Sequence, residues 1–447
     1  MGATETLSRL VTETETEHLP TWTFQEATRC FINYVGVCLG ASQEEGVGLL
    51  VNWATQEGGA PKGTVIGRDF RTSLGTAAML NGYMAHLLDF DDTHLPTILH
   101  PSAPVWPAAQ AIAEDRLKTG KEALAAFILG VEVESRLSLS VHPWHYDQGW
   151  HITGTAGVFG ATAAAGRLLG LNAEQMAQAF GIAGTQASGV REILGSMTKA
   201  MHPAKAASVG VQAALLAEMG FTGNDTMVEG RRGFWAVLSS PGHDETAIEI
   251  GLGERWELAN NGLKPYANGV VIHPLQDAAI SFRNDHNIKP EQVASITIRV
   301  HPLVIELTNR PNPRHGYDGK FSYQYCVAAA LVDGAGFPFQ FSDERFNDPA
   351  IVSLVPRVSA TVDPSVREDE TFMTLTLVDG QVLEKHIAHA TGSPTNPISN
   401  EFLEHKFRTL AQSCLSARQA DAFLQEAWGL EEAPDLSKIS TLMVPHP

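Results

Sequence analysis

The segment NGYMAHLLDFDDTHLPTILHPSAPVWP, residues 81–107, concentrates polar side chains next to an apolar run. Within twelve positions the chain places Asp89, Asp91, Asp92, Thr93, His94 and His100. The preceding run, AAMLNGYMAHLL, predicts a buried helix that ends where this polar cluster begins. Polar groups beside apolar surroundings are either fully hydrogen-bonded or chemically active, so this segment is the first candidate site.

The composition predicts a folded protein with a large core. The chain has 447 residues, of which 44% are hydrophobic and 18% are charged, and this length favours roughly two or three domains. The formal net charge is -19. A strongly acidic chain is a poor partner for nucleic acid or an anionic membrane, because both need basic surface. A small anionic substrate is compatible with it if the pocket is locally positive.

Cysteine usage and the first residues predict a cytoplasmic protein. The four cysteines, Cys30, Cys38, Cys326 and Cys414, form no CxxC pair, which favours reduced, buried thiols over a disulfide scaffold or a zinc site. Residues 1–18 are polar and acidic, unlike a signal or transit peptide. The sequence has no apolar run long enough to predict a transmembrane helix.

On both sides of residues 81–107, the spacing of apolar residues is mostly that of helices. Helices are expected at residues 22–42, 104–118, 121–140, 174–188 and from 397 onwards. The pattern of apolar and polar residues changes after about residue 262. There VASITIRVHP alternates like a strand, residues 320–333 resemble a helix, and Asp379-Gly380 predicts a hairpin turn. The pattern indicates a large helical domain interrupted by a smaller α+β domain.

Two further segments collect polar side chains. In PWHYDQGWHITGT, residues 143–155, the histidines His145 and His151 precede a small-residue helix. In MTKAMHPAKAA, Lys199, His202 and Lys205 lie on a loop and at the start of the next helix. These three are the positive charges that an anionic substrate would need, and Lys205 is the weaker candidate.

Six segments, taken in order, are similar to one known family. They are NGYMAHLLDFDDTH…HPS, GWHITGTAGVFGA, MTKAMHPAKAA, LKPY…HP, FSYQYCVAAALVDG and GSPTNPISNEFLEHKF, and they span nearly the whole chain. On these motifs the chain resembles the MmgE/PrpD family. Each segment alone is weak, but six in the same order are highly specific.

The resemblance implies a mainly α fold with two domains. A large all-α helical domain would comprise residues 1–263 and 396–447, and a smaller α+β lid domain would comprise residues 264–395. It also implies a homodimer, an active site between the domains and no cofactor. By motif match, the catalytic residues would be His100, His151, Asp89 and Tyr325, and the substrate-binding residues would be Thr93, Lys199 and Lys264.

The reactions of the family explain why these residue types would be needed. Its members dehydrate, decarboxylate or epimerise small carboxylic acids, and each reaction passes through carbanion-like charge beside a carboxylate. Histidines suit the proton transfers near neutral pH, with Asp89 orienting one of them. Lys199 and Lys264 suit the developing negative charge. Tyr325 would donate a proton or a hydrogen bond.

Structural interpretations stand beside these roles. His100 and His151 fit capping or core positions as well, and Asp91 and Asp92 are expected to cap helix ends or form a turn. Tyr325 lies in an apolar helix, so its assignment rests on the FSYQY match. The DxDD group also suggests magnesium, manganese or iron. Without a matching distant ligand pair, we predict no metal.

Departures from the family pattern reduce the number of reactions that this chain is expected to catalyse. After Lys264, the dehydratase-like pattern has Cys, Arg and Thr where this chain has Gly269, Val270 and Ile272. The segment HLPTIL, residues 94–99, also lacks the Trp-Gly pair of methylcitrate dehydratases. We therefore predict a lyase for a small di- or tricarboxylic acid, more like cis-aconitate decarboxylase than methylcitrate dehydratase. The alternatives are an isomerase or epimerase on a related carboxylate and a non-catalytic carboxylate-binding protein.

Overall fold

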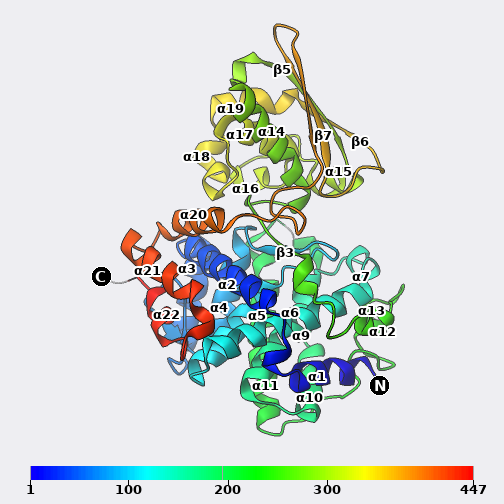
Figure 1. The fold of residues 1–447 in the computed structure, drawn as a ribbon, viewed down its shortest axis with the longest axis vertical. Helices are drawn as coiled ribbons and strands as arrows, with labels where there is room; N and C mark the ends of the chain where they lie inside the picture. The colour runs from blue at the N-terminus through cyan, green and yellow to red at the C-terminus, as the bar shows by residue number, and fades with distance from the viewer. Residues whose placement is uncertain (1, 194, 446–447) are drawn as a thin grey trace. The chain divides into compact units, whose positions relative to one another are not determined.

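The computed structural model describes residues 2–193 and 195–445. The chain forms two compact units (Figure 1). The larger unit contains the residues up to 87, residues 91–261 and the residues from 399 onwards, and the smaller unit contains residues 88–90 and 262–398. The chain therefore leaves the larger unit for three residues, inside the segment on which the sequence analysis opened.

The larger unit is built from helices. They are α1 (Ala3–Glu13), α2 (Thr21–Ala41), α3 (Glu45–Glu57), α4 (Leu74–Leu87), α5 (Ser102–Asp115), α6 (Gly120–Val141), α7 (Trp144–Asp147), α8 (Ile152–Thr155), α9 (Gly157–Leu169), α10 (Ala173–Gly184), α11 (Met201–Glu218), α12 (Phe234–Leu238), α13 (Thr246–Glu249), α20 (Asn400–Ala411), α21 (Ala417–Trp428) and α22 (Ser437–Leu442). Two short strands, β1 (Gly63–Thr64) and β2 (Arg71–Thr72), pair antiparallel between α3 and α4.

The core of this unit lies where α9 and α11 pack together with α4, α5 and α6. Helix α6, expected at residues 121–140, is buried on nearly all sides and starts at a capping box between Thr119 and Glu122. Helices α9 and α11 approach closely because small residues line their contact. A Cβ atom on Gly210 would lie 2.5 Å from the Cβ of Ala161 and 2.7 Å from its carbonyl carbon.

Two helical glycines give opposite predictions. Gly210→Ala is expected to lower the free energy of unfolding by about 1–3 kcal/mol, because the new methyl group collides with the backbone of α9. Gly48→Ala in α3 has no atom within 4 Å of the new Cβ, so it should raise that free energy by about 0.5–1 kcal/mol. Urea denaturation of both variants measures the difference. Equal effects would show that α9 and α11 do not pack as closely as described.

Helices from the N-terminal and C-terminal parts of the chain pack together in the larger unit. Helix α20 packs along α2, and a Cβ on Gly36 would lie 3.1 Å from the ring of Phe407. The helices expected from residue 397 onwards thus complete the domain that the first residues begin.

The smaller unit combines helices with a sheet. Its helices are α14 (His273–His286), α15 (Pro302–Thr308), α16 (Gly316–Gly319), α17 (Tyr323–Asp333), α18 (Asp343–Phe346) and α19 (Pro349–Leu354). The sheet has the strand order β6-β5-β7-β8, formed by β5 (Val293–Val300), β6 (Val358–Val362), β7 (Thr371–Leu377) and β8 (Val382–Ile387). Strand β6 runs parallel to β5, and the other pairs are antiparallel. Helix α14 packs against β7 and β8.

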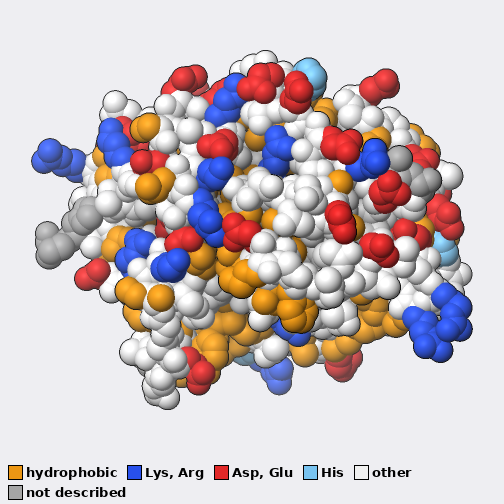
Figure 2. All heavy atoms as spheres, turned by 90° about the horizontal axis from the view of Figure 1, so that it is seen from below, with side chains coloured by type: hydrophobic (Ala, Val, Ile, Leu, Met, Phe, Trp, Pro, Cys, Tyr) orange, Lys and Arg blue, Asp and Glu red, His pale blue; other side chains and the backbone are white. Residues whose placement is uncertain are grey.

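The predicted fold class is confirmed: the chain is mainly α, with a smaller sheet-containing part (Figure 1). The short strand β3 (Asp92–His94) begins one residue after the chain re-enters the larger unit, and the short strand β4 (Asn261–Leu263) includes the point at which the chain leaves it again. Within the described residues, no helix has the length and apolar character needed to span a membrane. Acidic and basic side chains are interspersed on the face shown in Figure 2, and apolar side chains gather along its lower edge.

Candidate functional site

The candidate site in the larger unit begins at the end of α4. His86 lies in the last turn of this helix, and the chain re-enters the larger unit at Asp91. Asp91 places a carboxylate oxygen 2.7 Å from Nδ1 of His86, with both side chains buried. The same oxygen lies 3.6 Å from Nδ1 of His100. Asp91, which the sequence analysis took as structural, therefore contacts two histidines.

Asp92 has a structural role, as the sequence predicted. Its carboxylate accepts hydrogen bonds from the backbone N–H and the hydroxyl of Ser102, at 3.1 and 2.6 Å, where α5 begins. It also accepts a 2.7 Å bond from the amide of Asn261. Burial raises the pKa of this carboxyl group. The contacts anchor the loop to α5.

A strained turn positions His100. Ile98 has φ 59°, a conformation that is strongly disfavoured for a β-branched residue. The carbonyl of His94 accepts the backbone N–H groups of Thr97 and Ile98, and the ring of His94 lies 2.8 Å from the Thr97 hydroxyl and 3.2 Å from Glu257. These bonds hold the turn in place two residues before His100.

The proton on His100 has a defined location. Nδ1 lies 2.8 Å from the carbonyl oxygen of Asp92, and a carbonyl can only accept, so this nitrogen carries a proton. Thr93 places its hydroxyl 3.3 Å from the same nitrogen, and the backbone N–H of His100 donates to Thr153. In a neutral ring, Nε2 then has the lone pair, which is the form of a general base.

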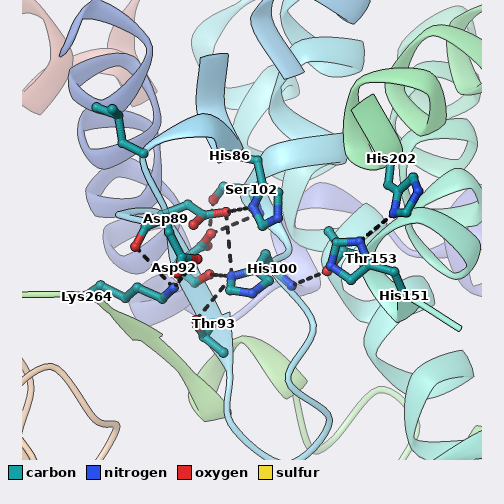
Figure 3. Close-up of polar contacts among 12 residues, drawn as sticks. His86, Asp89, Asp92, Thr93, His100, Ser102, His151, Thr153, His202 and Lys264 are labelled. Atoms are coloured by element: carbon teal, nitrogen blue, oxygen red, sulfur yellow. Dashed lines mark hydrogen bonds and ion pairs between the residues drawn. The ribbon is translucent and has the colours of Figure 1, made fainter. Parts of the chain in front are cut away.

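Four imidazole rings form a histidine row: His100, His86, His151 and His202. The successive ring centroids are 4.8, 5.6 and 5.1 Å apart (Figure 3). His151 is the N-cap residue of α8, and its backbone N–H donates to the carbonyl of Gly189 at 2.9 Å. The row brings two predicted catalytic histidines together with two that were not in the predicted set.

The rings of His151 and His202 are neutral at pH 7. Burial is the main cause, and it lowers the pKa of His151 well below its ordinary value. The neighbouring His86 and Lys199 lower it further. Burial also lowers the pKa of His202 to about 4. The expectation that His202 supplies positive charge was therefore wrong.

Lys199 is a buried cation beside this row. It lies in a 3-10 turn, Met197–Ala200, immediately before α11, and its side chain is only 7% exposed. Its charge acts on both His151 and His202. Lys205 is exposed and donates to the hydroxyl of Ser188 at 3.3 Å. The two lysines therefore differ in burial.

One group of three described residues, His86, Asp91 and His100, has the composition of a metal site. Its ligand atoms lie within 4.8 Å of one another. Nδ1 of His100 points to the Asp92 carbonyl, and Nδ1 of His86 to the Asp91 carboxylate, so binding an ion through these atoms would break both hydrogen bonds. The distances favour a hydrogen-bonded network.

The smaller unit holds a second predicted pair. Nζ of Lys264 lies 2.9 Å from the carboxylate of Asp89 and 3.3 Å from its carbonyl oxygen, with both side chains buried (Figure 3). Asp89 has φ 54°, a conformation that aspartate tolerates better than most residues. Nζ of Lys320 donates to the carbonyl of Leu88 at 2.6 Å. Two lysines thus hold residues 88–90.

Tyr325 lies in α17 of the smaller unit, and its side chain is 1% exposed. Its hydroxyl donates to the carbonyl of Gln340 at 2.5 Å. Burial raises the pKa of this hydroxyl. Within the described residues, its hydrogen bonds do not reach Lys264 or Asp89. A role in proton donation stays a prediction.

Sequence reasoning missed His86 as a site residue. The available signal was a single histidine inside an otherwise apolar run, five positions before Asp91. His145, which the sequence analysis had noted, binds elsewhere: its ring contacts the Leu238 carbonyl and the Thr155 hydroxyl, each at 2.7 Å. Its contacts support the fold around α8.

Comparison with known proteins finds relatives that cover most of the chain. Cis-aconitate decarboxylase of Mus musculus is 27% identical, over 99% of this chain and 93% of that protein. Cis-aconitate decarboxylase of Aspergillus terreus is 26% identical, over 85% of this chain and 83% of its own length. 2-Methylcitrate dehydratase of Cupriavidus necator is 25% identical, over 90% and 88%.

Two family domains account for most of the sequence. Residues 5–246 match the MmgE/PrpD N-terminal domain, and residues 266–432 match the MmgE/PrpD C-terminal domain. The chain therefore belongs to the MmgE/PrpD family.

Proposed function

We propose that this protein is a cofactor-independent lyase that decarboxylates a small unsaturated di- or tricarboxylic acid of the cis-aconitate type. The observation that carries the proposal is the histidine row, in which the neutral ring of His151 lies beside the cation Lys199. Similarity to cis-aconitate decarboxylases over most of the chain supports decarboxylation over dehydration.

The proposed chemistry needs one bond broken and one formed. The bond between carbon and the departing carboxylate breaks, and its electron pair moves onto the carbon skeleton beside a remaining carboxylate. CO₂ leaves, and a histidine delivers a proton to carbon. Because the negative charge develops in a buried site, a fixed cation stabilises it more strongly than it would in water.

The proposal assigns a role to each predicted residue. His100 and His151 transfer protons, and Thr93 holds His100. Lys199 and Lys264 bind substrate carboxylates, with Asp89 orienting Lys264. Tyr325 donates a hydrogen bond, which requires its hydroxyl to exchange the Gln340 carbonyl for the substrate.

Two lysines on neighbouring turns give a matched test. Lys199→Met is expected to lower kcat/KM for CO₂ release from cis-aconitate by about 100- to 1,000-fold, the effect of removing one group that stabilises transition-state charge. Lys205→Met, an exposed position, should stay within about twofold of wild type. A wild-type protein that releases no CO₂ and binds the acid unchanged would reject the lyase proposal. Equal losses in both variants would reject the role of Lys199.

The same proposal includes a homodimer in the cytoplasm. The family resemblance supports the homodimer. The four free cysteines of the described chain support the cytoplasmic location. Light scattering on the purified protein tests the assembly: a mass twice that of the 48.2 kDa chain is expected.

A further inference from the structure

His151 and His202 face each other through the same ring atom. Their Nδ1 atoms lie 2.9 Å apart, a hydrogen-bonding distance. A hydrogen bond between two neutral imidazoles requires a proton on one Nδ1 and a lone pair on the other. The location of that single proton therefore determines the tautomer of both rings.

Two glycines lie next to the His202 ring and leave room for its contact with His151. A Cβ on Gly154 would lie 2.9 Å from the Cβ of His202. Gly189 has φ 136°, and a Cβ there would lie 2.9 Å from Cγ and Nδ1 of the His202 ring. The carbonyl of Gly189 also accepts the backbone N–H of His151. The ring of His202 thus occupies a space that larger residues at these positions would fill.

The pair leads from the buried site towards solvent. His151 is 5% exposed, and His202 is half-buried. In Figure 3, His202 lies on the opposite side of His151 from His100. Within the described ranges, Nε2 of neither His151 nor His202 is hydrogen-bonded to another residue.

We propose that His202 is the proton relay of His151: it determines which nitrogen of His151 carries a proton and exchanges that proton with water. His202 does not contact the reacting carbon and acts through His151. The proposal rests on the proposed function, in which His151 transfers a proton at Nε2.

The relay keeps every proton accounted for. When a proton is delivered to the substrate, His151 gives its Nε2 proton to carbon. The Nδ1 proton of His202 then moves to Nδ1 of His151. His202 gains a proton from water at Nε2. After the product leaves, water in the emptied site protonates Nε2 of His151, the shared Nδ1 proton returns to His202, and His202 releases its Nε2 proton to water, which restores the starting tautomers. Both rings are neutral before and after each movement, so no imidazolium forms beside Lys199.

The surrounding charges favour this neutral exchange. The titratable groups that act on His151 are His86, Lys199, His202 and His100, and those that act on His202 are His86 and Lys199. These groups are cationic or become so, and each opposes a positive charge on the pair. A relay through a charged imidazolium would be costly here.

The test removes the ring and returns it from solution. His202→Ala is expected to lower turnover of cis-aconitate about 10- to 100-fold, the same size of effect as losing the hydrogen-bond partner of a metal-ligating histidine. Free imidazole should restore most of it by entering the space beside Gly154 and Gly189. His202→Asn should remain low even with imidazole, because its amide fills this space and can donate to His151 without relaying a proton. Gln212→Ala, an exposed position of α11, serves as the control with wild-type turnover.

A second readout does not depend on turnover. In protein labelled with ¹⁵N-histidine, the Nδ1 and Nε2 signals of His151 are expected to shift in His202→Ala and to return with imidazole. Unchanged signals, or wild-type turnover in His202→Asn, would overturn the relay. If wild-type protein converts no cis-aconitate, the proposed function fails, and the ¹⁵N signals still decide whether His202 sets the tautomer of His151.

Discussion

His151→Gln is expected to lower turnover of cis-aconitate about 100- to 10,000-fold, the contribution of a positioned general acid or base. Glutamine retains a polar side chain of similar reach, and the backbone bond to Gly189 is unaffected. The glutamine amide cannot transfer a proton at neutral pH. The loss should therefore appear in kcat as well as in kcat/KM, because proton transfer is needed only in the transition state.

The control for this variant is His18→Gln, since His18 is exposed and lies in an N-terminal turn. It should match wild type. Thermal unfolding of both variants checks that the fold is intact. If His151→Gln keeps turnover within tenfold of wild type while folded, His151 is not the proton-transferring group, and His100 becomes the leading candidate.

Arg136→Met is expected to lower the free energy of unfolding by about 3–5 kcal/mol, the cost of breaking a buried ion pair on one side. Arg136 is completely buried and bonds Glu132 at 2.5 Å. Its remaining N–H groups donate to the carbonyl oxygens of Ala247, Ile248, Ile250, Gly251 and Arg255. The substitution leaves these acceptors without their donor and fixes methionine in a polar space.

The damage should reach the candidate site as well. Glu132 accepts the backbone N–H of Glu257 at 2.7 Å, and Glu257 in turn contacts His94 in the turn before His100. Burial raises the pKa of Glu132 to about 7 even with Arg136 present, so this carboxyl group should be protonated once its partner is gone. Urea denaturation measures the stability, and CO₂ release measures the effect on turnover.

Arg408→Met provides the comparison. Arg408 also pairs with a glutamate four residues away, Glu404, and with Asp421, but it is exposed. Exposed ion pairs contribute about 0–1 kcal/mol. If both arginine variants lose equal stability, burial does not govern the contribution of these pairs, and the network around Glu132 is not the support described.

Most of the helices could be predicted because local periodicity determines them. The helix expected at residues 22–42 is α2, Thr21–Ala41, and the hairpin expected at Asp379-Gly380 joins β7 and β8. The parallel pairing of β5 with β6 could not be predicted in this way. These strands are separated by several helices, and their register depends on side chains that meet only in the folded unit.

The candidate site was predictable where motifs were dense and hidden where they were sparse. His100 and His151 stood out beside acidic or small residues. His86 sits in an apolar run, where a lone histidine more often has a structural role, and only its contact with Asp91 shows otherwise. The pairing of His151 with His202 joins residues 51 positions apart, which no local pattern encodes.

The most direct test of the central claim is proton NMR in D₂O with cis-aconitate, comparing wild type with His151→Gln. Wild type should release CO₂ and place deuterium on a single carbon of the product, where a histidine delivers a solvent-derived proton, and His151→Gln should give almost no product. Decarboxylation without deuterium at that carbon, or equal product from both proteins, would contradict proton transfer by the histidine row.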